Sequence, residues 1–308
     1  MTPRQYAMLL VKLAVTVGLL GWLLTTVDAG EVANRLTTVG APGAVGAVLA
    51  LVMLVPATAM RWGVVQQAIG APILPAQLIR LSLVGVFFNQ ILPTPIGGDA
   101  MRVWGARRLG LSLGKATSGV LLERAWGLGT LLLFTAPIWP WLLPETAPRM
   151  ALAAGSTAMA LIALLVGLAV LRHPPTRFTR RLPNVLVAFL DDARATTIPV
   201  SRMLAVLVWS VAGHAASMGA MAILAAAMGL ALPPIDILIA VPIALLAAVV
   251  PISFAGWGVR EGALVATLTA LGATQADALA LSVAFGLTHL PLALPGAVLW
   301  LVARDGRS

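Results

Sequence analysis

Long runs of apolar residues, separated by short polar and basic segments, dominate the chain. A helix that crosses about 30 Å of hydrocarbon needs about 20 mostly apolar residues. Six runs reach that length without interruption, and they predict six full membrane-spanning helices. These runs cover residues 7–27, 42–60, 116–143, 150–171, 203–231 and 277–303.

Two further apolar regions, 76–100 and 237–272, are interrupted near the middle by proline and glycine, which end a helix and permit a tight turn. Cytoplasmic loops of membrane proteins collect Lys and Arg. Arg61 and the basic stretch 102–115 flank the first region, so both of its ends are predicted to be cytoplasmic. Arg304 places the end of the last span in the cytoplasm, so this span must start outside. The second region, which precedes that span, is therefore predicted to begin and end outside. Each region is therefore predicted to be a re-entrant hairpin, and the two hairpins enter from opposite faces.

The two hairpin tips share one spacing, in which four residues separate Pro from Gly and three separate Gly from Arg. The first tip begins at Pro93 and the second at Pro251. Together with the matching order of spans, this spacing predicts an inverted repeat. We expect an all-α, polytopic membrane protein with one domain, 1–308, and pseudo-repeats 1–145 and 146–308. Each repeat is read as helix, helix, re-entrant hairpin, helix, which gives six full spans and two hairpins.

Composition excludes a soluble fold, since 60% of the residues are hydrophobic, 10% are charged and the mean hydropathy is +0.97. A net charge of +9 in a membrane chain indicates orientation and contact with anionic lipid rather than nucleic acid. The chain has no cysteine, its three histidines show no metal-ligand spacing, and residues 110–116 depart from the phosphate-loop pattern. We therefore expect no enzyme activity, no metal and no cofactor.

Charged residues inside the apolar segments are the candidates for function, because an ionised side chain there costs roughly 2.5–3.5 kcal/mol. Glu123 is expected to pair with a hairpin arginine, while Arg124 faces a cavity or a lipid phosphate. Arg102 and Arg260 are expected to bind the phosphate, and an acid such as Glu261 an attached amine. The alternative is structural: the ion pair locks helices together, the acids cap helices and the arginines reach the interface.

The remaining hairpin positions are expected to shape the turns. Asp99 is expected to cap the helix after the first break, and Asn89 to bond carbonyl groups that the break frees. The full set of predicted structural residues is Asn89, Pro93, Gly97, Gly98, Asp99, Pro251, Gly256, Gly258 and Gly262.

Two further expectations concern residues outside the hairpins. His214 and His289 are each expected to form an interhelical hydrogen bond rather than a proton relay. The segment 178–194 alternates arginine with apolar residues at helical spacing, which predicts an amphipathic helix on the cytoplasmic leaflet. An ordinary solvated connector is the alternative for that segment.

Four ordered motifs make the chain resemble a known family. They are Phe87-Phe88-Asn89-Gln90-Ile91-Leu92-Pro93, Gly97-Gly98-Asp99 with Arg102, Leu121-Leu122-Glu123-Arg124, and Pro251-Ile252-Ser253 with Gly256-Trp257-Gly258-Val259-Arg260-Glu261-Gly262. The chain is similar in these motifs to the lysylphosphatidylglycerol synthase transmembrane family of flippase-like proteins. The resemblance implies a flippase module, which larger members fuse to a cytosolic domain that aminoacylates phosphatidylglycerol. Because this chain ends at Ser308, the resemblance supports lipid movement and argues against lipid synthesis.

The function expected from these observations is a lipid flippase of the bacterial inner membrane with both termini in the cytoplasm. It would move a phosphate-bearing headgroup through a polar cavity between the hairpins, driven by an ion or lipid gradient. The partners are membrane lipids: anionic or zwitterionic phospholipids, or polyprenyl- or hopanoid-type lipids. Two alternatives stay open. One is a membrane scaffold or regulator of a lipid-modifying or glycosyl-transferring enzyme, and the other is an intramembrane lipid-transferring enzyme that uses Glu123 and Glu261.

Overall fold

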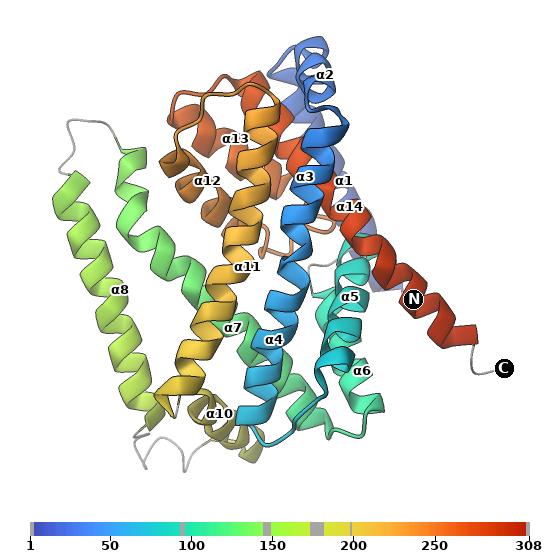
Figure 1. The fold of residues 1–308 in the computed structure, drawn as a ribbon, viewed down its shortest axis with the longest axis vertical. Helices are drawn as coiled ribbons and strands as arrows, with labels where there is room; N and C mark the ends of the chain where they lie inside the picture. The colour runs from blue at the N-terminus through green and yellow to red at the C-terminus, as the bar shows by residue number, and fades with distance from the viewer. Residues whose placement is uncertain (1–2, 93–95, 144–148, 173–181, 198, 306–308) are drawn as a thin grey trace. The chain divides into compact units, whose positions relative to one another are not determined.

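The computed structural model describes residues 3–92, 96–143, 149–172, 182–197 and 199–305, and all regular structure within these ranges is helical. Figure 1 shows the elements in chain order. The helices are α1 (Pro3–Thr25), α2 (Ala29–Thr38), α3 (Gly40–Val52), α4 (Leu54–Ala68), α5 (Pro75–Ile91), α6 (Gly97–Arg108), α7 (Leu113–Ile138), the 3₁₀ turn η1 (Trp139–Leu142), α8 (Arg149–Arg172), α10 (Asn184–Thr197), α11 (Val200–Ala227), α12 (Pro234–Ala247), α13 (Val259–Ala270) and α14 (Gln275–Asp305).

Within the described residues, four helices are long and apolar enough to cross a membrane. They are Gly40–Ala68, which joins α3 to α4, and then Leu113–Ile138, Val200–Ala227 and Gln275–Ala303. These helices match four of the six predicted spans. The first predicted span is α1, which meets the length and hydropathy requirement together with α2 across a 95° bend, and the fourth corresponds to α8.

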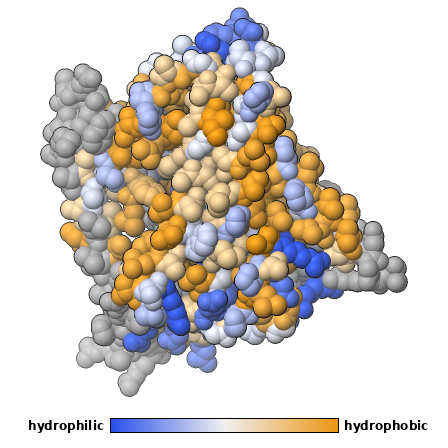
Figure 2. Space-filling model, viewed as in Figure 1, coloured by the Kyte–Doolittle hydropathy of each residue, from blue (hydrophilic) through white to orange (hydrophobic). Residues whose placement is uncertain are grey.

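The exterior of these helices is apolar, as expected for contact with lipid. Figure 2 shows apolar side chains over much of the visible surface. Leu49 on α3 and Val208 on α11, for example, are 66% and 64% exposed. Such exposure over whole helices would be unusual in a soluble protein, where large apolar patches are limited in area. The chain is therefore a multi-pass membrane protein.

Residue contacts divide the chain into two compact units. Unit 1 contains Met1–Leu54, Leu83–Ala100 and His214–Ser308, and unit 2 contains Val55–Ser82 and Met101–Gly213. In unit 1, α12 packs on α13, α13 on α14, and α14 on α2 and α3. In unit 2, α7 packs on α8, and α10 packs on both. The unit boundaries thus differ from the limits of the pseudo-repeats.

Both regions predicted to be hairpins consist of two short helices joined by a break. In the first, α5 ends at Ile91 and α6 begins at Gly97; Pro93 lies in the break, outside the described residues. Asn89 of α5 contacts Gly98 of α6, and farther from the break a Cβ on Gly105 of α6 would meet the Leu81 side chain of α5. These two contacts show that α5 and α6 run antiparallel.

The second break, between α12 and α13, is a compact turn. Ala255, Gly256 and Gly258 have positive φ values of 51°, 81° and 86°, a region that glycine enters without the steric cost of a Cβ. This explains why glycine stands at the two positions, 256 and 258, that were predicted to shape the turn. Thr16 of α1 accepts a hydrogen bond from the Phe254 N–H at 2.8 Å, so α1 satisfies a backbone group that the turn exposes.

The predicted amphipathic helix is present as α10, but it begins at Asn184, and the preceding residues 178–181 lie outside the described part of the chain. Phe189 and Ala193 pack into an apolar cluster of unit 2, whereas Val185 is 79% exposed. Lys115 of α7 pairs with Asp192 of α10 at 2.5 Å. One face of α10 is therefore docked on the helices, and contact of its other face with the membrane stays a prediction.

The close approach of α5 and α6 gives a stability prediction at Gly98. A Cβ at this position would overlap the carbonyl oxygen of Gly85 and lie 2.6 Å from Oδ1 of Asn89. We expect Gly98→Ala to lower the free energy of unfolding by about 1–3 kcal/mol, the usual cost of overpacking. The thermal unfolding midpoint in detergent, followed by tryptophan fluorescence, measures the change.

Gly262→Ala is the matched control, because a Cβ on this helical glycine would meet no atom within 4 Å. Alanine in an open helical position is expected to be neutral or to stabilise by up to about 1 kcal/mol. Equal effects of the two variants would show that α5 and α6 do not pack as described. The same open space means that packing does not require glycine at 262, one of the predicted structural positions.

Candidate functional site

The first candidate site is a buried ion-pair cluster in unit 2, centred on Glu123 of α7. Arg102, one turn into α6, donates from Nη1 to Oε2 of Glu123 at 2.8 Å. Arg61 of α4 donates from Nε to Oε1 of the same carboxylate at 2.8 Å. Each carboxylate oxygen therefore has its own guanidinium partner. Glu123 thus pairs with an arginine of the first hairpin, as the sequence predicted.

The cluster lies in the interior of unit 2. Glu123 is 2% exposed and Arg102 5%. The guanidinium carbon of Arg102 lies 4.3 Å from the ring centre of Trp62, a cation–π contact that is stronger when the cation is shielded from water. Arg61 also contacts the hydroxyl of Ser210 on α11 at 3.3 Å. Four helices, α4, α6, α7 and α11, thus contribute a side chain to one polar cluster.

Small residues make room for this cluster. A Cβ at Gly127 of α7 would lie 3.0 Å from Nη2 of Arg61. About two turns of helix earlier, a Cβ at Gly119 would overlap the Gln66 side chain. Helices in membranes approach closely where small residues allow it. Glycine at 127 therefore lets α7 come close enough to α4 for Arg61 to reach Glu123.

The second candidate site, in unit 1, is the start of α13. Glu261 accepts a hydrogen bond from the backbone N–H of Gly258 at 2.6 Å through Oε2, and one from Nε of Arg260 at 3.0 Å through Oε1. Glu261 is fully buried and Arg260 is 7% exposed. The acid thus caps its own helix and neutralises the neighbouring arginine. Of the roles considered from the sequence, the cap is the one that this geometry supports for Glu261.

Aromatic rings complete the environment of Arg260. Its guanidinium carbon lies 4.9 Å from the ring centre of Trp257 and 5.9 Å from that of Phe285 on α14. Gly286 faces this group, since a Cβ there would clash with Arg260 and lie 2.7 Å from Trp257. Arg260 is therefore enclosed by aromatic faces and by a carboxylate.

The two hairpin arginines share one arrangement: a buried guanidinium, a tryptophan face and a buried carboxylate. They differ in the source of the carboxylate. Glu123 reaches Arg102 from another helix, whereas Glu261 is the residue next to Arg260. Arg124, half-buried at the position after Glu123, was also predicted to bind the substrate, and that role stays a prediction.

At the first break, the helix that follows is capped by a residue of the preceding helix. Oδ1 of Asn89 accepts a hydrogen bond from the Gly98 N–H at 2.8 Å, so Asn89 caps the helix that follows the break. The bond shown is to a freed amide N–H, and bonding of Asn89 to freed carbonyl groups stays a prediction. Asp99 is buried in the first turn of α6, where a negative charge favours the helix N-terminus. A Cβ at Gly97 would lie 2.7 Å from Leu92, so this glycine allows close packing in the turn.

Sequence reasoning misplaced or missed several residues. Arg61 was interpreted as a cytoplasmic marker, but α4 continues to Ala68, and Arg61 is buried at Glu123. His289 was expected to bond another helix, yet its Nδ1 lies 2.9 Å from the Phe285 carbonyl oxygen of its own helix. The aromatic partners Trp62 and Trp257 carried no recognisable signal beyond their closeness in sequence to Arg61 and Arg260.

The chain matches the model of a known protein family. The family model described as the lysylphosphatidylglycerol synthase TM region matches residues 9–296, which is nearly the whole chain and includes both candidate sites. No curated protein matches the chain.

The shared carboxylate at the first site predicts a large effect of Glu123→Gln. This change removes the charge that balances two buried guanidinium groups. Breaking a buried ion pair by removing one partner costs roughly 3–5 kcal/mol, so we expect a clear fall in the thermal unfolding midpoint.

Glu31→Gln is the control variant for Glu123→Gln, because it removes one charge from an exposed position in α2. It is expected to change stability by less than about 0.5 kcal/mol. If the two variants unfolded at the same temperature in the same detergent, Glu123 would not hold the arginines as described.

Proposed function

Because the chain belongs to the lysylphosphatidylglycerol synthase transmembrane region family, we propose that it is a flippase. In this proposal it moves a phosphate-bearing lipid headgroup across the membrane, and Arg102 and Arg260 are the phosphate contacts. The membrane is the bacterial inner membrane, and both termini are cytoplasmic. The four ordered motifs of the family include both of these arginines.

One observation carries the proposal: an arginine is buried just after each helix break of a membrane chain. Ionisable residues inside a membrane are costly and usually mark a pathway or a binding site. Guanidinium groups match the geometry of phosphate with several parallel donors. A buried ion pair is also weak evidence for a purely stabilising role, since apolar replacements are often equally stable. A headgroup ligand therefore accounts for the buried arginines better than stability alone.

The proposed mechanism is an exchange of partners at the arginines. When no lipid is bound, Glu123 and Glu261 hold the guanidinium groups in fixed positions and balance their charge. A lipid phosphate then replaces a carboxylate oxygen on an arginine, so that the headgroup finds a preorganised donor without bulk water. No proton or covalent bond is transferred in this exchange, and the proposal assigns no enzyme activity, metal or cofactor to the chain.

The proposal includes two re-entrant hairpins, α5–α6 and α12–α13, related by an inverted repeat. Three features support it: both segments are broken, α5 and α6 run antiparallel, and α12 packs on α13. Inverted repeats with broken helices build the binding sites of many transporters. Both breaks also fall in unit 1, within Leu83–Ala100 and His214–Ser308.

A second function is favoured by a specific observation. Each hairpin arginine already has a carboxylate within hydrogen-bond distance. Charges that are paired in this way also suit a membrane scaffold that holds or regulates a lipid-modifying or glycosyl-transferring enzyme. In that case the ion pairs would only fix the helices, and the protein alone would move no lipid.

Lipid movement in reconstituted vesicles tests the proposal. The double variant Arg260→Gln/Glu261→Gln removes both charges together, so no unpaired charge is left buried, and the glutamine carbonyl can still accept from the Gly258 N–H. We expect an unfolding midpoint near that of the original protein and at least about a tenfold loss of lipid movement, the effect of losing a charge-assisted hydrogen bond. Fluorescently labelled phosphatidylglycerol and a reductant that cannot cross the membrane measure the rate.

Arg108→Gln is the matched control for this experiment. Arg108 lies 4.3 Å over Trp104, as Arg102 does over Trp62, but Arg108 is exposed. This variant is expected to keep the original rate. An unchanged rate in the double variant would remove Arg260 from the pathway, and vesicles that move no more lipid than protein-free ones would favour the scaffold.

The hairpins give a separate prediction about sidedness. The chain has no cysteine, so single cysteines report unambiguously. We expect Leu74→Cys and Leu109→Cys, before α5 and after α6, to react with an impermeant thiol reagent from the cytoplasmic side. Ala231→Cys and Gln275→Cys, before α12 and at the start of α14, should react from the outside. Opposite sidedness within either pair would show that the segment crosses the membrane, and the hairpin would be refuted.

A further inference from the structure

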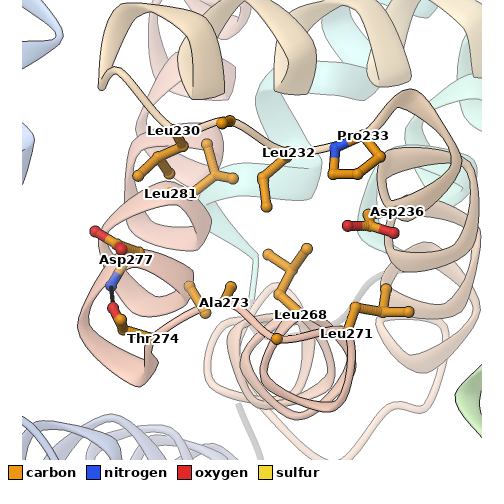
Figure 3. A pocket seen from close by; sticks show the side chains of 13 residues that line it. Leu230, Leu232, Pro233, Asp236, Leu268, Leu271, Ala273, Thr274, Asp277 and Leu281 are labelled. Carbon is orange, nitrogen blue, oxygen red and sulfur yellow. Dashed lines mark hydrogen bonds between the residues drawn. The ribbon is translucent and has the colours of Figure 1, made fainter.

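A pocket of about 280 Å³ lies in unit 1, where the ends of α11 and α13 meet the starts of α12 and α14. Figure 3 shows it from close by. Most of its wall is apolar, and the leucines include Leu232, Leu268 and Leu271. Two acids also line it: Asp236 and Asp277 stand at opposite sides of the view. The pocket is separate from both arginine sites, whose residues do not line it.

The two acids differ in what neutralises them. Asp277 lies 2.8 Å from Nε of Arg35 on α2, and its backbone N–H donates to the Thr274 hydroxyl at 3.1 Å. Asp236 is 8% exposed, and the structure gives its carboxylate no hydrogen bond or ion pair among the described residues. Among the described residues Asp236 is therefore a largely buried acid without a protein partner, and it lines a pocket whose other residues are mostly apolar.

Asp236 stands at the start of a helix. It lies in the first turn of α12, where the helix dipole stabilises a negative charge. This helix end is preceded by Pro233, which offers no side-chain cap. A buried carboxylate is costly unless it is paired. The pocket thus combines a buried carboxyl group with space for a cation that would balance its charge.

We propose that this pocket binds an ammonium group carried on a short apolar stem, with Asp236 as its counter-ion. The leucine side chains would enclose the stem, and the carboxylate would accept hydrogen bonds from the ammonium. The source is either a free amine or the amine of a lipid headgroup, since both present the same chemistry. A divalent metal fits less well, because Ca²⁺ and Mg²⁺ require six or more oxygen ligands. No group of three or more acids or histidines that could hold a metal occurs in the described residues.

Binding of the n-butylammonium ion to purified protein in nanodiscs tests this site. The neutral n-butanol has the same number of heavy atoms and serves as the matched ligand. We expect calorimetry to detect butylammonium binding, and Asp236→Asn to weaken it by roughly 10- to 100-fold, as for loss of a charged hydrogen bond. Glu31→Gln is the matched control protein, because Glu31 also lies in the first turn of a helix but is exposed. It should bind like the original protein.

A second measurement does not depend on any variant. An apolar carbodiimide is expected to label Asp236 in the original protein, and butylammonium, but not butanol, should protect it, as read by mass spectrometry. Equal binding of butylammonium and butanol, or equal binding by Asp236→Asn, would overturn the proposal and leave water or a proton in the pocket. Labelling that butylammonium does not reduce would also overturn it.

Changing the lipid composition of the nanodiscs distinguishes a free amine from the amine of a lipid headgroup. Nanodiscs of phosphatidylglycerol alone are compared with nanodiscs that also contain phosphatidylethanolamine. If the apparent affinity for butylammonium falls in the second preparation, the lipid amine occupies the pocket. If it is unchanged, the ligand is a free amine. Lipid movement is not measured in these experiments, so their outcome is independent of the proposed flippase function.

Discussion

The structure depends on one constraint: inside a lipid bilayer, backbone polar groups and charges must find their partners within the protein. A straight helix meets this requirement by itself, but a broken helix exposes amide and carbonyl groups. At each described break a side chain supplies the missing partner. The side chain of Asn89 accepts a hydrogen bond from the Gly98 N–H. In the same way, Thr16 accepts one from the Phe254 N–H and Glu261 one from the Gly258 N–H. The breaks are therefore supported features of the fold.

The same constraint explains the surroundings of the buried arginines. Arg102 and Arg260 each have a carboxylate for charge and hydrogen bonding and a tryptophan ring for the face of the guanidinium. Gly286 leaves the space that Arg260 needs, and Gly127 leaves space for Arg61, the other arginine partner of Glu123. Charge, aromatic contact and small residues thus act together to hold a guanidinium group where water is scarce. Each guanidinium group is thereby held by several partners at once.

Much of the fold followed from the sequence, because hydrophobic length and proline–glycine breaks are local signals. Four of the predicted spans, both breaks and the partnership of Glu123 with a hairpin arginine are confirmed. Arg61 was misplaced, because counting basic residues does not distinguish a loop arginine from one inside a helix that continues past it. His289 bonds its own helix, and Asn89 bonds an amide, because side-chain direction depends on packing that spacing does not encode. The isolated carboxylate of Asp236 was equally invisible, since its neighbours come from distant loops.

The two carboxylates that hold the arginines differ in one respect. Glu261 uses one oxygen for its helix start and the other for its arginine, whereas these tasks are divided between Asn89 and Glu123 at the first break. At the second break, guanidinium and main chain are therefore mechanically linked through three atoms of one side chain. Losing Glu261 would therefore remove a helix cap and the counter-ion of Arg260 together, whereas at the first break Asn89 and Glu123 each supply one of these.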